Sequence, residues 1–117
     1  MPSDETLLSE CGLTHIGEWD TFFTKVKLLA GKTPTDFYQH FNTGWKSLSK
    51  GPHNNKIKVL LIGRTLGFAD VLIVWQTENG EATKAFEDTI LVSSTTCTHT
   101  CETAYCIKYR LWGSVPK

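Results

Sequence analysis

The chain has 117 residues, of which 40% are hydrophobic and 21% are charged, a balance typical of one soluble globular domain. Its 12 basic and 12 acidic side chains cancel, and no basic stripe follows the chain, which argues against a nucleic-acid partner. No apolar run reaches the roughly 18–20 residues that span a bilayer, and no secretory signal is present at the N-terminus. We therefore expect a cytoplasmic protein that binds neither nucleic acid nor a membrane.

Residues 1–18 are predicted to form an N-terminal extension with a short helix, because Ser3-Asp4-Glu5 can cap a helix that Gly12 ends. A single domain is expected over residues 19–112, followed by a tail over 113–117. Its first element, Trp19–Leu29, alternates between two faces and is rich in aromatic and β-branched residues, which predicts a strand.

The next element has the clearest boundaries. Thr33 is a suitable N-cap, Pro34 fits the first helical position, and Gly51-Pro52 ends the element after Lys50. The spacing of four large apolar residues predicts one buried stripe on a helix over Pro34–Lys50; they are Phe37, Phe41, Trp45 and Leu48.

The remaining pattern completes a β-α-β-β-α-β order. It predicts strands at Lys56–Arg64 and Ala69–Thr77, a helix at Glu81–Leu91, and then strands at Thr96–Cys101 and Ala104–Trp112 or one bent strand. This order predicts an α+β, ferredoxin-like fold, in which two helices cover one face of an antiparallel sheet.

Two of these strands are apolar on both faces. Ile57, Val59 and Leu61 are expected opposite Leu60 and Ile62, and Val71, Ile73 and Trp75 opposite Leu72 and Val74. A solvated face would forfeit about 1.5–3 kcal/mol for each large apolar side chain and would leave an adhesive patch. The sequence therefore predicts that a second copy of the chain packs on the sheet, in a homodimer or a higher oligomer.

A segment around the third strand resembles a known group of proteins. Gly67–Trp75, the acidic loop Thr77–Ala82, Phe86 and the later Thr98–Thr100 are similar to the dimeric α+β barrel proteins, and among them to GYD-domain proteins and to the effector domains of leucine-responsive (Lrp/AsnC-type) regulators. The resemblance implies an oligomeric ferredoxin-like barrel and a role for Asp70 at a ligand or an interface. Such barrels host regulators, oxygenases, isomerases and haem-active enzymes, so the fold alone does not decide the function.

The first functional hypothesis is an oligomeric domain that binds a small molecule, such as an amino acid or another carboxylate, for regulation or sensing. Arg64, Gly67 and Asp70 would lie near this ligand, and Trp45 and Trp75 could line its pocket, although core packing explains both tryptophans as well. For Asp70, the alternative is a carboxylate that accepts backbone hydrogen bonds in the turn. No Gly-rich phosphate loop or hydrolase motif is present, and no cofactor is predicted.

Two alternatives stay open. A cofactor-independent oxygenase or isomerase would use His40 or His99 as its acid or base inside an aromatic pocket. The alternative for His40 is a half-exposed histidine on the helix without a catalytic role. A metal-binding protein would use Cys97, His99 and Cys101, which alternate along a predicted strand and so share a face. Cysteines of this kind are more often small core residues, and no metal is assigned.

Overall fold

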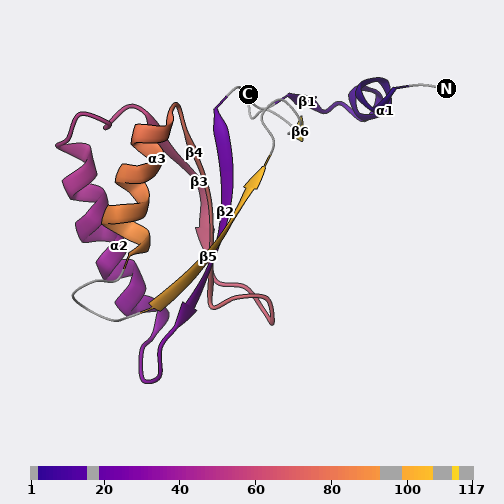
Figure 1. The fold of residues 1–117 in the computed structure, drawn as a ribbon. Coiled ribbons are helices and arrows are strands. Elements are labelled where there is room, and N and C mark those ends of the chain that lie inside the picture. The colour runs from indigo at the N-terminus through magenta and orange to yellow at the C-terminus, as the bar shows by residue number, and fades with distance from the viewer. Residues whose placement is uncertain (1–2, 16–18, 93–98, 107–111, 114–117) are drawn as a thin grey trace.

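The computed structural model describes residues 3–15, 19–92, 99–106 and 112–113. A four-stranded sheet carries two helices and a π-helical turn on one face (Figure 1). The elements are α1 (Asp4–Glu10), β1 (Thr14–His15), β2 (Asp20–Leu28), α2 (Pro34–Ser49), β3 (Ile57–Gly63), β4 (Val71–Thr77), α3 (Gly80–Phe86), η1 (Glu87–Leu91), β5 (His99–Cys106) and β6 (Trp112–Gly113). The sheet order β3-β4-β2-β5, with antiparallel neighbours, is the predicted ferredoxin-like arrangement.

Helix α2 begins where its capping residues predict. The Thr33 hydroxyl accepts a hydrogen bond from the Asp36 backbone N–H at 3.3 Å, and the Asp36 carboxylate accepts one from the Thr33 backbone N–H at 2.8 Å. The bond from the Thr33 backbone also holds the pKa of the Asp36 carboxyl below its ordinary value. Phe37 is fully buried against the sheet. None of the helices in the described residues combines the length and the apolar character that crossing a bilayer requires.

The second helix of the domain changes its winding part of the way along. Asn79 caps α3 by accepting a hydrogen bond from the Ala82 backbone N–H at 2.9 Å. After Phe86 the chain continues as the π-helical turn η1, which ends with a bond from the Val92 N–H to the Glu87 carbonyl. The predicted buried face is present, but the sequence predicted a uniform helix, because a π-helical turn leaves no marker in the apolar spacing.

A bulge in β3 changes which residues face the helices. The strand pairs with β4 through Val59 and then through Leu61, so Leu60 is an extra residue. After the bulge, Ile62 packs on the core while Leu61 lies on the opposite face and is 53% exposed. The prediction that Leu61 shares a face with Ile57 and Val59 is therefore wrong, because one inserted residue exchanges the two faces of a strand.

Strand β5 is continuous through the position where the sequence suggested a break. It pairs with β2 from His99, opposite Leu28, to Cys106, opposite Thr21. Eight consecutive cross-strand pairs hold it. Of the two predicted alternatives, the division between residues 101 and 104 is therefore wrong, and a single strand crosses this position. Positions 96–98 and 107–111 of the predicted strands lie outside the described residues.

A second, two-stranded sheet was not predicted. Strand β1 pairs with β6 in the antiparallel sense, Thr14 with Gly113 and His15 with Trp112. The His15 and Trp112 rings lie 4.1 Å apart, centroid to centroid. This sheet joins the predicted N-terminal extension to Trp112, at the end of the predicted domain, and to Gly113, in the predicted tail. Neither two-residue strand by itself predicts the pairing.

The centre of the core is a stack of three aromatic rings. Trp75 on β4 lies between Phe22 on β2, at 4.3 Å, and Phe86 on α3, at 4.2 Å between ring centroids. Its indole N–H donates a hydrogen bond to the Thr24 hydroxyl at 2.8 Å, and this hydroxyl also bonds Thr103 on β5 at 2.9 Å. The stack and these bonds join three strands to α3 on the helix-covered face.

The opposite face of the sheet, which we call the uncovered face, has an apolar row across all four strands. Both helices that flank the core lie on the other side (Figure 1). The row crosses the sheet from β3 through β4 and β2 to β5, and each of its residues is the sheet partner of the next. In this order the residues are Leu61, Val74, Phe23 and Ala104. The two-sided apolar pattern of the sequence therefore corresponds to one face against the helices and one face on which no other described element of the monomer packs.

Candidate functional site

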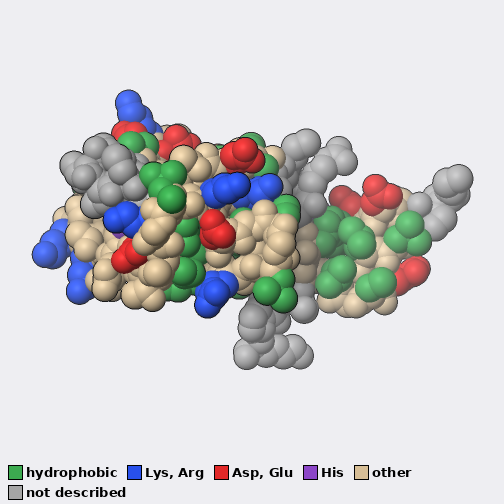
Figure 2. All heavy atoms as spheres, turned by 90° about the horizontal axis from the view of Figure 1, so that it is seen from below, with side chains coloured by type: hydrophobic (Ala, Val, Ile, Leu, Met, Phe, Trp, Pro, Cys, Tyr) green, Lys and Arg blue, Asp and Glu red, His purple; other side chains and the backbone are tan. Residues whose placement is uncertain are grey.

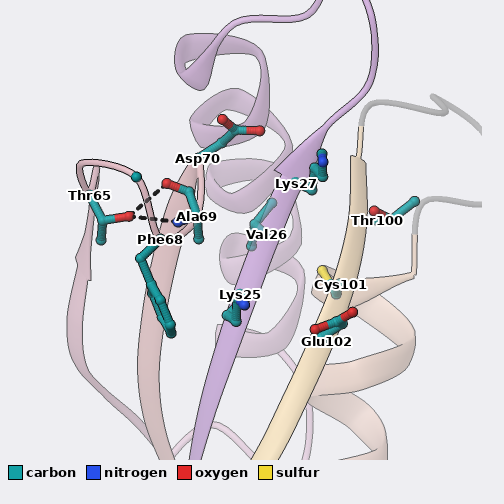
Figure 3. A pocket seen from close by; sticks show the side chains of 11 residues that line it. Lys25, Val26, Lys27, Thr65, Phe68, Ala69, Asp70, Thr100, Cys101 and Glu102 are labelled. Atoms are coloured by element: carbon teal, nitrogen blue, oxygen red, sulfur yellow. Dashed lines mark hydrogen bonds between the residues drawn. The ribbon is translucent and has the colours of Figure 1, made fainter.

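A pocket of about 480 Å³ lies on the uncovered face, where β2, β5 and the loop between β3 and β4 meet (Figure 3). Its charged residues are Lys25 and Lys27 on β2, Glu102 on β5 and Asp70 at the end of the loop. This volume falls within the range of about 300–1,000 Å³ that is typical of small-molecule sites. The pocket therefore combines a suitable size with charges of both signs.

The loop over residues 64–70 is closed by its own hydrogen bonds. The Thr65 hydroxyl donates to the Ala69 carbonyl at 2.6 Å and accepts from the Ala69 N–H at 3.0 Å (Figure 3). Gly67, between them, has φ +76°, a left-handed conformation that glycine adopts without a steric penalty. The loop wall of the pocket is therefore held by hydrogen bonds within the loop itself.

Asp70 ties this loop to the neighbouring strand. Its carboxylate accepts a hydrogen bond from the Leu28 N–H at 2.7 Å, and its own N–H donates to the Val26 carbonyl at 3.1 Å. The sequence offered a backbone-bonding carboxylate as one reading of Asp70, but within the turn; the bond instead crosses to β2. Asp70 thereby fixes where the loop sits relative to the lysines of β2.

The two pocket lysines are residues that the sequence-based site prediction did not include. Lys25 and Lys27 are two positions apart on β2 and so point to the same face. The Lys25 ammonium lies 4.4 Å from the centroid of the Phe68 ring, and Lys25 is the sheet partner of Glu102. Two lysines at alternate positions of a strand were the signal in the sequence, but their convergence with the loop depends on the tertiary structure.

A smaller apolar hollow of about 270 Å³ adjoins the pocket on the same face and shares three of its residues, Lys25, Phe68 and Glu102. The rest of its wall is largely hydrophobic and comes from three strands; the residues are Phe23, Leu72, Thr103 and Ala104. The uncovered face thus holds a charged pocket beside an apolar one.

The structure brings together only some of the residues predicted for ligand binding. Gly67 and Asp70 line the pocket. Arg64 is exposed where the loop begins, and within the described ranges it forms no ion pair with Asp70. Trp45 is half-buried on α2, and Trp75 is in the core, so neither tryptophan lines the pocket or the hollow.

The two predicted acid–base histidines lie side by side but outside both pockets. His40 Nε2 is 2.8 Å from the Ile90 carbonyl oxygen, and His99 Nε2 is 3.1 Å from that of Leu91. A carbonyl only accepts hydrogen bonds, so each Nε2 carries a proton and donates it. Ile90 and Leu91 are the last two residues of η1, where backbone carbonyls lack partners within the helix. The hydrogen bonds from His40 and His99 therefore attach the end of this turn to α2 and to β5.

This arrangement predicts an acid-sensitive stability. Burial lowers the pKa of His99 below its ordinary value of 6.5. The hydrogen bond to the Leu91 carbonyl partly opposes this shift, and the charge of the nearby His40 adds to it. The unfolded chain therefore binds more protons once the pH falls below about 6.5, and stability is lost toward the lower folded pKa. Between about pH 7.5 and 5.5, the unfolding free energy should fall more for the wild type than for His99→Gln. Urea titrations that give parallel pH dependences for the two proteins contradict this prediction.

The predicted metal trio is only partly described. Cys97 lies outside the described residues. Burial raises the pKa of the Cys101 thiol to about 11, which keeps it protonated and weakly nucleophilic at neutral pH. Among the His, Cys, Asp and Glu residues that the structure describes, no three are grouped to hold a metal ion. The trio remains a prediction from the sequence.

Neither a protein-family model nor a curated protein sequence matches the chain. Among solved structures, Escherichia coli AsnC superposes with a TM-score of 0.50 at 13% identity, covering 86% of this chain and 58% of that one. A transcriptional regulator from Neisseria meningitidis, NMB0573 in complex with L-Met, gives a TM-score of 0.46 at 18% identity, covering 99% of this chain and 62% of that one. The chain therefore spans less than two thirds of either protein. The fold implied by the resemblance to Lrp/AsnC-type effector domains is confirmed: this chain has a ferredoxin-like α+β fold similar to that of AsnC.

Proposed function

We propose that the chain is a regulatory or sensing domain that binds a small carboxylate, such as an amino acid, and works as a homo-oligomer. The observation that carries this proposal is the pocket on the uncovered face, with its internally hydrogen-bonded loop and its two lysines. Ligand sites of this kind combine a largely preformed cavity with a few placed polar groups.

The charges of the pocket support a ligand that has a carboxylate group. Lys25 and Lys27 offer ammonium donors on one side of the pocket. Glu102 and Asp70 offer acceptors, although one oxygen of Asp70 already bonds the Leu28 N–H. A ligand with both an anionic and a cationic group would satisfy both signs of charge, and an amino acid is the simplest molecule of this type.

The apolar row supports the oligomeric part of the proposal. Leu61, Val74, Phe23 and Ala104 form a continuous band across the sheet, and Leu61 is 53% exposed in the monomer. Burying this band between two copies would recover hydrophobic free energy that the monomer forgoes. The resemblance of Gly67–Trp75 to Lrp/AsnC-type effector domains leads to the same proposal.

The proposal predicts that Lys27→Gln weakens the binding of an amino acid or another small carboxylate about tenfold or more, because a hydrogen bond to a charged group is worth about 1.5–3 kcal/mol. Isothermal titration of a panel of L-amino acids and dicarboxylates against the full chain would first identify the ligand. The titration is then repeated with the variant.

Lys46→Gln is the matched control, since Lys46 is an exposed lysine on α2 that lines neither pocket. Its affinity should equal that of the wild type. Equal affinities for wild type and Lys27→Gln would remove this pocket as the carboxylate site, and a panel without any binder would remove the proposed ligand class.

The oxygenase or isomerase alternative requires a histidine that faces a substrate cavity. Neither the pocket nor the apolar hollow is lined by a histidine, and both His40 and His99 bond the carbonyls at the end of η1. We therefore do not propose an enzymatic activity for the uncovered face.

A further inference from the structure

Leu66 is the most exposed large hydrophobic residue of the described chain, with a relative exposure of 102%. It lies in the β3–β4 loop, which projects from the uncovered side of the sheet (Figure 1). The two hydrogen bonds between Thr65 and Ala69 hold this loop, and Asp70 ties it to β2. The hydrogen-bonded loop thus exposes a leucine side chain to water. An exposed leucine lacks the stabilisation of about 1.5–3 kcal/mol that its burial would give.

A partner for this side chain is present on the same face. The apolar hollow has walls formed by Phe23, Leu72 and Ala104, and its volume of about 270 Å³ admits a branched aliphatic side chain. The fully exposed Leu66 does not fill the hollow of its own chain. The face therefore carries both an apolar projection and an apolar recess, which is what a self-complementary contact requires.

The size of the sheet also calls for the loop in any contact between two copies. Four strands spaced by about 4.8 Å, with seven residues at about 3.4 Å each, present roughly 450 Å² per subunit. Stable interfaces bury about 800 Å² per partner. A contact that includes the projecting loop comes closer to this area than a contact of the flat sheet alone.

The charges around the hollow suit a second copy rather than a strongly charged partner. In the view from below Figure 1, toward the lower ends of the strands, basic, acidic and hydrophobic side chains are intermingled on the surface (Figure 2). Lys25 and Glu102, of opposite sign, both line the hollow. The chain as a whole has a formal net charge of zero, so two copies do not repel each other strongly.

We propose that Leu66 of each subunit inserts into the hollow formed by Phe23, Leu72 and Ala104 on a second copy of the chain. The inference rests on the proposed self-association through the uncovered face, and it names the contact that fixes the register of the two sheets. Two such contacts form in an isologous dimer, one for each loop.

Sedimentation equilibrium of the full chain tests this contact. Leu66→Ser should weaken dimerisation at least about tenfold, as expected for a side chain seated in a desolvated pocket. Leu66→Met, which keeps an apolar side chain, should stay close to the wild type. Leu7→Ser is the control, because Leu7 is also exposed, at 47%, but lies on α1 (Figure 1).

A second measurement locates the contact directly. In dimers mixed from isotope-labelled and unlabelled chains, Leu66 methyl protons should show intermolecular NOEs to the Phe23 ring. A wild-type dimer that Leu66→Ser leaves unchanged, or one without these NOEs, overturns this inference while leaving self-association intact. A wild type that stays monomeric overturns both this inference and the proposed oligomer.

Discussion

Trp75→Ala should lower the free energy of unfolding by about 3–5 kcal/mol, the range for truncating a large aromatic residue in a packed core. Trp75 is fully buried, and its ring stacks between Phe22 and Phe86. The variant also loses the indole N–H donor that bonds the Thr24 hydroxyl. Removing the ring therefore leaves a cavity where β2, β4 and α3 meet.

Urea titration followed by circular dichroism measures this loss. Trp45→Ala is the matched control. Trp45 is a half-buried tryptophan on α2 that packs at the edge of the core and stacks on Phe41, so its loss should cost clearly less than that of the fully buried Trp75. Trp75→Phe, which keeps a ring in the stack, gives a folded variant even if Trp75→Ala does not fold. A larger loss for Trp45→Ala than for Trp75→Ala would contradict the assignment of Trp75 to the core.

Val74→Asp should abolish self-association at concentrations where the wild type is oligomeric, with a dissociation constant raised about a hundredfold or more. Val74 lies within the apolar row, with Leu61 as its partner on one side and Phe23 on the other. In an interface, the new carboxylate would be desolvated without a paired cation, which costs several kcal/mol. In the monomer the same carboxylate stays in contact with water.

Size-exclusion chromatography with light scattering measures the mass of the variant. Val92→Asp is the matched control, because Val92 follows η1 with an exposure of 50% and takes no part in the row. Circular dichroism shows whether each variant remains folded. A folded Val74→Asp protein with the wild-type mass and affinity would exclude the uncovered face as the interface.

Local signals in the sequence predicted most of the elements. Thr33 and Pro34 determine where α2 begins, because the N-cap hydrogen bonds and the fixed φ of proline involve only residues a few positions apart. The alternating pattern of β2 and β4 correctly predicted which residues of each strand share a face. On β4, for example, Val71, Ile73 and Trp75 are all fully buried on the helix-covered face. Such features depend on neighbours a few positions apart, and so the sequence alone reveals them.

The features that the sequence did not reveal depend on pairing between distant residues. The bulge at Leu60 arises from the register of β3 on β4, and β1 exists only because β6 lies beside it. The candidate site shows the same limit. Gly67 and Asp70 were identified through the resemblance of their segment. Lys25 and Lys27 lie beside them because β2 pairs with β4, which follows the loop, and because Asp70 bonds β2, about 40 positions earlier in the chain.

We propose that the uncovered sheet face is buried between copies of this chain. Sedimentation equilibrium of the wild-type protein, from low to high micromolar concentration, tests it most directly. If the face is buried between copies, the measured mass is twice the 13.1 kDa of one chain, or a larger even multiple of 13.1 kDa. A mass of 13.1 kDa at every concentration, with and without the carboxylate panel, would contradict it.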